Sequence, residues 1–245
     1  MSEWAPKVFW SEVRVSEEGG GYAVLLDGRV ICTPAKAQFI VPTKPLADAI
    51  AREWRRQDTH IDPISMPFTR MANAAIDKLS VQHKEVCEML ASYGDSDLLC
   101  YRADSPKELV DRQSAAWDPL LEWCAKNLGA RLQPRVGVMP RPQSEADLSR
   151  LSALVHELNS YELSGFHDLV VISGSLVIGF AVLRGHIEAE TAFKTSRIDE
   201  SFQQELWGVD DEAAAQEAVK KAEFLTAEAF LMMVRSANSA PMIKK

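Results

Sequence analysis

The sequence predicts an α+β protein in which a small N-terminal antiparallel β domain is followed by a larger, mostly α-helical domain. In the first forty residues, short apolar runs alternate with glycine-containing turn signals, which is typical of antiparallel strands. After Thr43 the apolar side chains recur about every four residues, which is the spacing along one face of an α-helix. We therefore expect the β domain at residues 1–42 and the helical domain at residues 43–245.

The β domain is expected to be a small meander. Its strands are predicted at residues 8–15, 22–26, 29–33 and 39–41. Asp27-Gly28 is a strong two-residue hairpin signal between the second and third strands, because this turn needs residues that tolerate positive φ angles. Pro34 ends the third strand, since proline has no amide hydrogen to donate to a sheet.

The helical domain is expected to begin directly after the sheet. Thr43 is the predicted N-cap of the first helix, whose apolar face includes Leu46 and Ile50. A proline-containing loop follows at residues 63–67. The apolar spacing beyond this loop predicts one long helix or two short ones, ending near Gly94.

A capping box at residues 105–108 predicts a further helix that runs toward Gly129. Pro119 lies inside this span and predicts a kink or a restart, because proline removes a backbone donor and clashes with the preceding turn. Three prolines then mark a candidate sub-boundary near residues 132–143. A helix-rich lobe is expected to follow, with its first helix opening at Ser144.

The longest apolar stretch, residues 169–183, is predicted to be a buried helix. Serines and glycines interrupt it, and it is shorter than the roughly 20 residues that a membrane span requires. Gly174 and Gly179 would let a neighbouring helix approach closely. Two amphipathic helices are expected in the last third, separated at Trp207-Gly208.

The charge and the cysteine content exclude several classes of protein. A formal net charge of −8 argues against a nucleic-acid partner, because such partners require clustered Lys and Arg. The four cysteines lie far apart without a Cys-x-x-Cys pair, which favours free thiols in a reducing compartment. The N-terminus leaves no room for a signal or transit peptide before the first strand, so a cytoplasmic protein is expected.

Familiar catalytic spacings are missing from the sequence, including the Gly-x-Ser-x-Gly elbow, the P-loop and the His-Glu-x-x-His pair. His83 and Cys87 stand four residues apart on an expected helix and would share a face. No second closely spaced pair completes a metal site with them. We therefore expect neither a metal nor a cofactor.

A polar cluster at residues 95–102 leaves two interpretations open. In one, it is an active-site loop of a small-molecule enzyme, with a pocket near Asp97, Tyr101 and Arg102. A buried polar pocket with strongly shifted acid pKa values would favour this interpretation. In the other, it is a strand-like connector whose Asp97 and Arg102 form caps and structural ion pairs.

Short motifs along nearly the whole chain match those of a known family in the right order. The first half holds Lys7–Trp10, Leu26–Arg29, Thr33–Lys36, Pro63–Pro67, Arg70, Asn73 and Ile76-Asp77. The motifs continue with Asp97–Ala103, Gln113, Trp117–Leu121, Gln203, Glu205, Trp207-Gly208 and Glu212-Ala213. Together they resemble the assembly chaperones for the alpha subunit of the ATP synthase catalytic sector.

The resemblance implies a chaperone and not an enzyme. Such a protein binds the unassembled alpha subunit, prevents its aggregation and releases it to the beta subunit. This function is physically reasonable, because an orphan subunit of an obligate ring exposes a large apolar interface that aggregates unless it is covered. We expect the chain to act as a monomer without inserting into a membrane. Compared with the mitochondrial members of the family, it lacks an N-terminal transit extension, so a bacterial member is expected. A structural adaptor that stays permanently in a complex is a further interpretation.

The resemblance also implies where the partner binds. Glu205 is the first candidate, with Trp207 and Asp199 near it. The alternative for this segment is a helix end with a packed tryptophan and a glycine C-cap. Further positions match family motifs and either have a functional role or join the two domains: Asp97, Arg102, Arg70 and Asn73.

Overall fold

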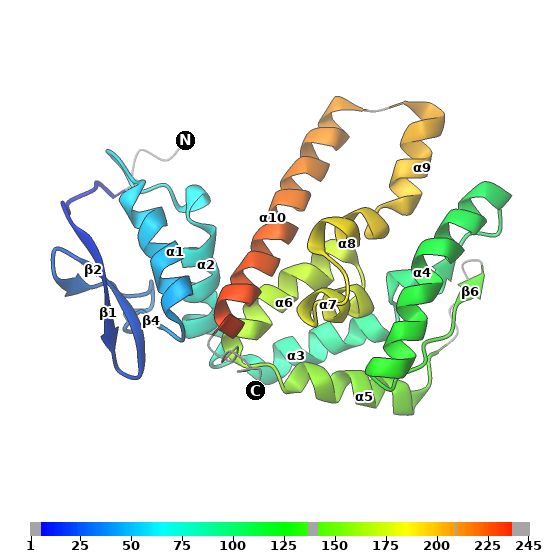
Figure 1. Ribbon diagram of the computed structural model, residues 1–245, viewed down its shortest axis with the longest axis horizontal. Coiled ribbons are helices and arrows are strands. Elements are labelled where there is room, and N and C mark those ends of the chain that lie inside the picture. Colours follow the sequence, from blue (N-terminus) through cyan, green and yellow to red (C-terminus); the bar gives the residue numbers. More distant parts are fainter. Residues whose placement is uncertain (1–5, 137–141, 209, 237–245) are drawn as a thin grey trace, which may run out of the picture. The chain divides into compact units, whose positions relative to one another are not determined.

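The computed structural model describes residues 6–136, 142–208 and 210–236, and it confirms the predicted fold class (Figure 1). An N-terminal antiparallel sheet is followed by a largely helical chain. The chain divides into two compact units. The first contains residues 1–83, 160–165 and 229–245, and the second contains residues 84–159 and 166–228. Helices α6 (Ser160–Ser173) and α10 (Asp211–Arg235) therefore contribute residues to both units.

Strand β2 (Gly21–Leu26) is the central strand of the sheet. It pairs antiparallel with β1 (Val13–Glu18) along its whole length. Its other edge pairs with both β3 (Arg29–Val30) and β4 (Ile40–Val41). The predicted meander continues past β3 through an antiparallel bridge between Cys32 and Gln38, but β4 then pairs with β2 and not with β3. The reason is a tight turn at residues 32–38, which brings the chain back to the edge of β2.

The hairpin between β2 and β3 forms at Asp27-Gly28, as predicted. The two residues have φ angles of 46° and 80°. The carboxylate of Asp27 also accepts hydrogen bonds from the amides of Glu12 and Ser11, at 2.8 and 3.0 Å. These bonds lower the pKa of Asp27, because they stabilise its ionised form. The turn residue therefore also fixes the chain segment that enters β1.

Helix α1 (Lys44–Arg55) packs on the sheet within the first unit. Thr43 is its N-cap, as predicted, and the Thr43 hydroxyl accepts a hydrogen bond from the amide of Leu46. Leu46 and Ile50 are fully buried on the face of α1 that the periodicity indicated. The compact unit that holds the sheet thus extends past residue 42. The boundary between domains at residues 42 and 43 stays a prediction.

Two further helical elements of the first unit each begin at a proline of the expected loop. It comprises the 3₁₀ turn η1 (Pro63–Ser65), helix α2 (Pro67–Ala74) and the π-helical turn η2 (Ala75–Leu79). A side chain of α1 caps α2 from outside: Glu53 accepts hydrogen bonds from the amides of Phe68 and Thr69, at 2.7 and 2.8 Å. The Thr69 hydroxyl also donates to Glu53, at 2.6 Å. This buried carboxylate joins the two helices.

Replacement of Glu53 by alanine is expected to lower the free energy of unfolding by about 2–3 kcal/mol. The change leaves two amides and a hydroxyl without their acceptor in a buried place. Urea denaturation followed by circular dichroism measures the effect. The matched control is Asp48→Ala on the same helix, which removes only an exposed ion pair with Lys44 and should cost less than about 0.5 kcal/mol. Equal losses in the two variants would contradict the capping role.

The second unit is mostly helical. Its first elements are α3 (His83–Ala91), η3 (Ser92–Gly94), η4 (Leu98–Cys100), β5 (Tyr101–Arg102), α4 (Lys107–Asn127) and β6 (Arg135–Val136). They are followed by α5 (Glu145–His156), α7 (Leu176–Leu183), α8 (Ala189–Ser196) and α9 (Ile198–Trp207). Strands β5 and β6 form a short parallel pair. The expected sub-boundary near residues 132–143 includes residues 137–141, which lie outside the described residues.

Helix α4 differs from its prediction at two points. Its N-cap is Pro106, without a side-chain hydrogen bond, so the predicted capping box is wrong. Of the kink and the restart that were predicted at Pro119, the restart is wrong, because the helix continues through this residue. Trp117 and Leu121 on either side of the proline are both buried, so packing holds the helix together across the missing amide donor. Asp118, which directly precedes the proline, pairs with Arg102 at 2.7 Å.

The apolar stretch at residues 169–183 is mostly buried, with Val171 exposed, but it forms parts of two helices and not the single helix that was predicted. Helix α6 ends before Gly174, whose φ of 70° reverses the chain, and α7 begins after its N-cap Ser175. Gly179 lets α7 approach α6 closely, as its small size predicted. A β-carbon at this position would lie 2.7 Å from a methyl group of Val170. In the described part of the chain, no helix is long and apolar enough to cross a membrane.

Candidate functional site

Asp97 lies at the centre of the second unit and is fully buried. Its carboxylate accepts hydrogen bonds from the amide of Leu99 (3.0 Å), the hydroxyl of Ser175 (2.7 Å) and the amide of Val177 (3.0 Å). It is thereby the N-cap of η4 and also holds the first turn of α7. Burial raises the pKa of Asp97 to about 6, and the accepted hydrogen bonds oppose this shift. The residue connects two segments that are far apart in the sequence.

Arg102 is also committed to structural contacts. Its Nε donates to the carbonyl of Leu99 at 2.8 Å, and its Nη2 pairs with Asp118 at 2.7 Å. The guanidinium lies over the ring of Trp117, 5.3 Å from the ring centroid. Tyr101, its neighbour, is a half-exposed residue of β5. These contacts support the interpretation of the cluster as a connector with caps and ion pairs.

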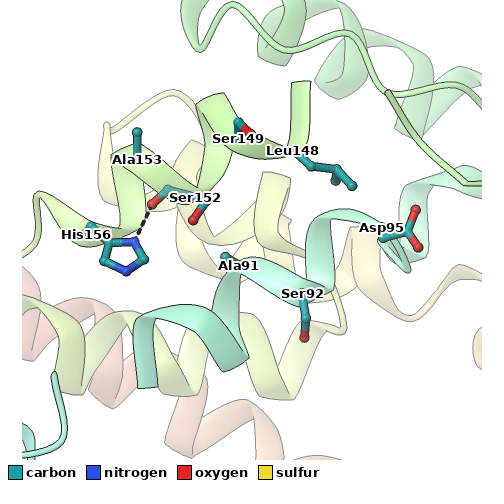
Figure 2. A pocket seen from close by; sticks show the side chains of 8 residues that line it. All are labelled: Ala91, Ser92, Asp95, Leu148, Ser149, Ser152, Ala153 and His156. Carbon is teal, nitrogen blue, oxygen red and sulfur yellow. Dashed lines mark hydrogen bonds between the residues drawn. The ribbon is translucent and has the colours of Figure 1, made fainter. Parts of the chain in front are cut away.

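A surface hollow lies elsewhere, between α3 and α5 (Figure 2). It has a volume of about 520 Å³ and is open to solvent, and Asp95 and His156 lie at opposite ends of it. Both are already hydrogen-bonded: Asp95 accepts from the amide of Gln143, and Nδ1 of His156 bonds the carbonyl of Ser152. Neither Asp97 nor Arg102 lines this hollow. Among the described residues, no group of three or more His, Cys, Asp or Glu side chains is arranged to hold a metal ion.

Arg70 and Asn73, the two family-motif residues of the first unit, both lie on α2. Arg70 is exposed, whereas Asn73 is half-buried. The side-chain oxygen of Asn73 is buried without a hydrogen-bond partner. The same is true of Oδ1 of Asp77, one turn further along the chain. The other oxygen of Asp77 accepts from the amide of Ala35, so this face of the helix fixes the turn that follows β3.

The three candidate partner-binding residues all lie on α9, at different places along it. Asp199 belongs to the first turn and is half-buried. Its carboxylate accepts a hydrogen bond from the side-chain amide of Gln113 at 2.6 Å. The oxygen of that same amide accepts from the backbone of Ala103. Gln113 is itself almost fully buried, so this pair fixes the start of α9 against α4.

Glu205 lies near the end of α9 and is exposed. It pairs with Arg112 of α4 at 2.8 Å, and the same guanidinium pairs with Glu108 at 2.7 Å. Hydrogen bonding to Arg112 lowers the pKa of Glu205, and the two carboxylates raise that of Arg112. The guanidinium also lies 5.2 Å from the ring centroid of Phe202. The cluster of these two glutamates and one arginine has a net charge of −1.

Trp207 is 82% exposed, and Leu206 beside it is 59% exposed. The predicted alternative of a packed tryptophan is therefore wrong, because α9 ends in solvent at this point. The predicted C-cap at Gly208 is confirmed by its φ of 90°, which a glycine adopts without strain. An exposed Leu-Trp pair beside an ionised glutamate is typical of a protein-binding surface, since tryptophan is enriched at interface hot spots.

Two members of this surface have no counterpart among the predicted site residues. Arg112 binds Glu205 across 93 positions of sequence, and no short-range pattern indicates such a pair. Leu206 is apolar and lies on an amphipathic helix, so its spacing alone did not distinguish it from a core residue. Gln113 belongs to a family motif, but only its bonds to Asp199 and Ala103 show what it does.

Comparison with known proteins gives consistent matches. A family model described as ATP12 chaperone protein matches residues 7–125. The crystal structure of Atp12 from Paracoccus denitrificans matches with a TM-score of 0.91 at 47% identity, over 94% of this chain and 99% of that one. A mutant of the same organism's Atp12p, with lysine in place of one aspartate, matches at 0.92 and 47% over 96% and 100%. Protein atp12, mitochondrial, of Schizosaccharomyces pombe is 28% identical over 218 residues, which is 84% of this chain and 75% of that protein.

These matches define the class of protein as an assembly chaperone that is not an enzyme. The chain belongs to the ATP12 chaperone protein family, which assists the assembly of ATP synthase. The resemblance found in the sequence is thereby confirmed. The alternative of a small-molecule enzyme is wrong, and the physical reason is visible at Asp97 and Arg102, whose polar atoms are used to join helices.

Proposed function

We propose that this chain binds the unassembled alpha subunit of the ATP synthase catalytic sector, prevents its aggregation and releases it to the beta subunit. One observation carries the proposal: the chain matches an Atp12 structure over 94% of its length at 47% identity. At that level a shared partner is the simplest expectation. The exposed Leu-Trp pair at the end of α9 supports it, because a holding chaperone needs an apolar surface that it can cover and uncover.

We propose that Glu205 and Trp207 contact the partner and that Asp199 acts by holding α9 in place. Trp207 has a large apolar side chain that is exposed to solvent and therefore accessible to a partner. Glu205 adds a charge at the rim, where it affects selectivity more than affinity. Such a surface is small compared with a permanent subunit interface, so the beta subunit can displace the chaperone. A permanent adaptor would need a larger apolar face.

The function is tested by light scattering of purified alpha subunit under aggregating conditions. Addition of this protein is expected to suppress scattering, and later addition of beta subunit is expected to release the alpha subunit into an alpha–beta complex. Trp207→Ala should weaken the suppression about tenfold or more, since a buried interface tryptophan contributes about 2 kcal/mol or more. Glu205→Lys should also weaken it, because two cations would then lie side by side at Arg112.

The matched control is Glu17→Lys, which makes the same charge change on an exposed strand of the first unit. It should suppress aggregation as the wild type does. Unchanged scattering in the presence of the wild type, with no complex on gel filtration, would refute the proposed partner. If both α9 variants suppressed aggregation as the wild type does, the contact surface would lie outside α9, and the proposed function would still stand.

A further inference from the structure

The negative charge of the chain is concentrated in one segment. Residues 198–219 contain seven acidic residues and no Lys, Arg or His, so they carry a formal charge of −7. The whole chain has a net charge of −8. All other residues together are therefore nearly neutral. We name residues 198–219 the acidic hairpin, because they comprise α9 and the first part of α10.

The acidic hairpin is formed by two antiparallel helices of the second unit (Figure 1). Gln204 of α9 donates a hydrogen bond to Glu217 of α10 at 3.2 Å, which joins the two helices. Phe202 is its one buried residue among those described. The described residues from Glu205 to Ala213 are all exposed, and Val219 is 58% exposed as well. This is a helical face without a covering element in the described chain.

The carboxylates at the tip of the hairpin are only partly accounted for by the fold. Asp210 accepts a hydrogen bond from the amide of Glu212, as a helix cap does. Asp211 and Glu212 lie in the first turn of α10, where negative charge suits the positive end of the helix dipole. No Lys or Arg of the described residues pairs with either of them. The dipole does not explain why Leu206 and Trp207 stand exposed among these charges.

We propose that the acidic hairpin binds a cationic segment of the partner, in which an apolar side chain is flanked by lysines or arginines. The apolar side chain would cover Trp207 and Leu206, and the cations would pair with Asp211 and Glu212. An acidic segment would be repelled by the charge of −7, and a neutral one would leave the carboxylates desolvated without compensation. The inference rests on the proposed function, since it names the kind of segment in the alpha subunit that this surface takes.

The contribution of complementary charge and that of the apolar anchor can be separated by measuring the association and dissociation rates. Charge at an interface rim accelerates association and loses this effect as salt screens it, whereas a buried aromatic anchor slows dissociation. We therefore expect the association rate with alpha subunit to fall about tenfold between about 20 mM and about 300 mM salt. The triple variant Glu205→Gln, Asp211→Asn and Glu212→Gln should associate about tenfold more slowly at low salt and depend less on salt.

The matched control removes three exposed carboxylates of the first unit by Glu17→Gln, Glu18→Gln and Asp58→Asn. It should retain the wild-type association rate and salt dependence. Trp207→Ala should keep the association rate and raise the dissociation rate about tenfold or more. Circular dichroism melts of all variants separate binding effects from loss of fold, because neutralisation at exposed positions should leave the melting temperature within a few degrees.

A second readout identifies the segment itself. Overlapping peptides that span the alpha subunit are probed with the full-length chain, and the bound peptides should contain an apolar residue between Lys or Arg residues. Replacement of those cations by glutamine should abolish capture. Capture of acidic or uncharged peptides would overturn the inference, as would equal association rates for the triple variant and its control. Failure of the wild type to bind alpha subunit at all would instead refute the proposed function.

Discussion

Replacement of Asp97 by alanine is expected to lower the free energy of unfolding by about 3–5 kcal/mol, a large part of the stability of a typical domain. The substitution leaves the amides of Leu99 and Val177 and the hydroxyl of Ser175 without an acceptor in a fully buried place. Each such donor costs about 1–3 kcal/mol, and the losses are not fully additive. Chemical denaturation with a tryptophan fluorescence readout measures the change.

Asp62→Ala is the matched control for Asp97→Ala. Asp62 also caps a 3₁₀ turn, since it accepts a hydrogen bond from the amide of Ile64 at 3.0 Å, but its side chain is exposed and water can replace the lost acceptor. We expect a loss of about 1 kcal/mol or less. A loss of similar size in the two variants would contradict the assignment of Asp97 as the residue that holds η4 to α7.

Asp97 also makes the stability of the protein depend on pH. Burial raises its pKa in the folded state to about 6, from 3.8, so the folded protein binds a proton more tightly than the unfolded chain does. The stabilisation from this group is full below about pH 4 and is lost as the pH rises through about 6. Its full size is about 3 kcal/mol. Asp97→Asn should flatten the pH dependence of unfolding between about pH 4 and about pH 6 relative to the wild type, and an unchanged slope would show that Asp97 does not titrate there.

Trp117→Ala should be about as severe as Asp97→Ala, with an expected loss of about 3–5 kcal/mol. Trp117 is fully buried on α4, and its ring lies beneath the guanidinium of Arg102. Its Nε1 donates a hydrogen bond to the carbonyl of Thr195 at 2.9 Å, which ties α4 to the end of α8. The substitution therefore opens a cavity and removes a buried hydrogen bond together. Urea denaturation measures both effects at once.

Two further variants separate these effects. Trp117→Phe keeps most of the ring but cannot donate to Thr195, so its loss of about 1–2 kcal/mol reports mainly the hydrogen bond. Trp207→Ala makes the same change as Trp117→Ala at a side chain that is 82% exposed, and it should alter stability by less than about 0.5 kcal/mol. If Trp207→Ala destabilised the fold as strongly as Trp117→Ala, Trp207 would belong to the core and not to a binding surface.

The local features of this protein were determined by its sequence. The change of apolar spacing near Thr43 separated sheet from helices, and the Asp27-Gly28 turn, the Thr43 cap and the Ser144 cap all formed where they were predicted. These features depend on hydrogen bonds and φ angles within a few residues, and such interactions can be inferred from neighbouring side chains. The family was also recognisable from short motifs along the chain, before any contact was known.

Only the tertiary structure decided the features that depend on distant residues. The pairing of β4 with β2, the continuity of α4 through Pro119 and the commitment of Asp97 to Ser175 all arise from packing across long stretches of sequence. Whether a tryptophan is core or surface is likewise settled by what packs against it, which is why Trp117 is buried and Trp207 is exposed. The sequence by itself determined the change from sheet to helices, the caps at Thr43 and Ser144 and the excess of acidic charge at residues 198–219, whereas the folded chain decided that this charge surrounds an exposed apolar pair.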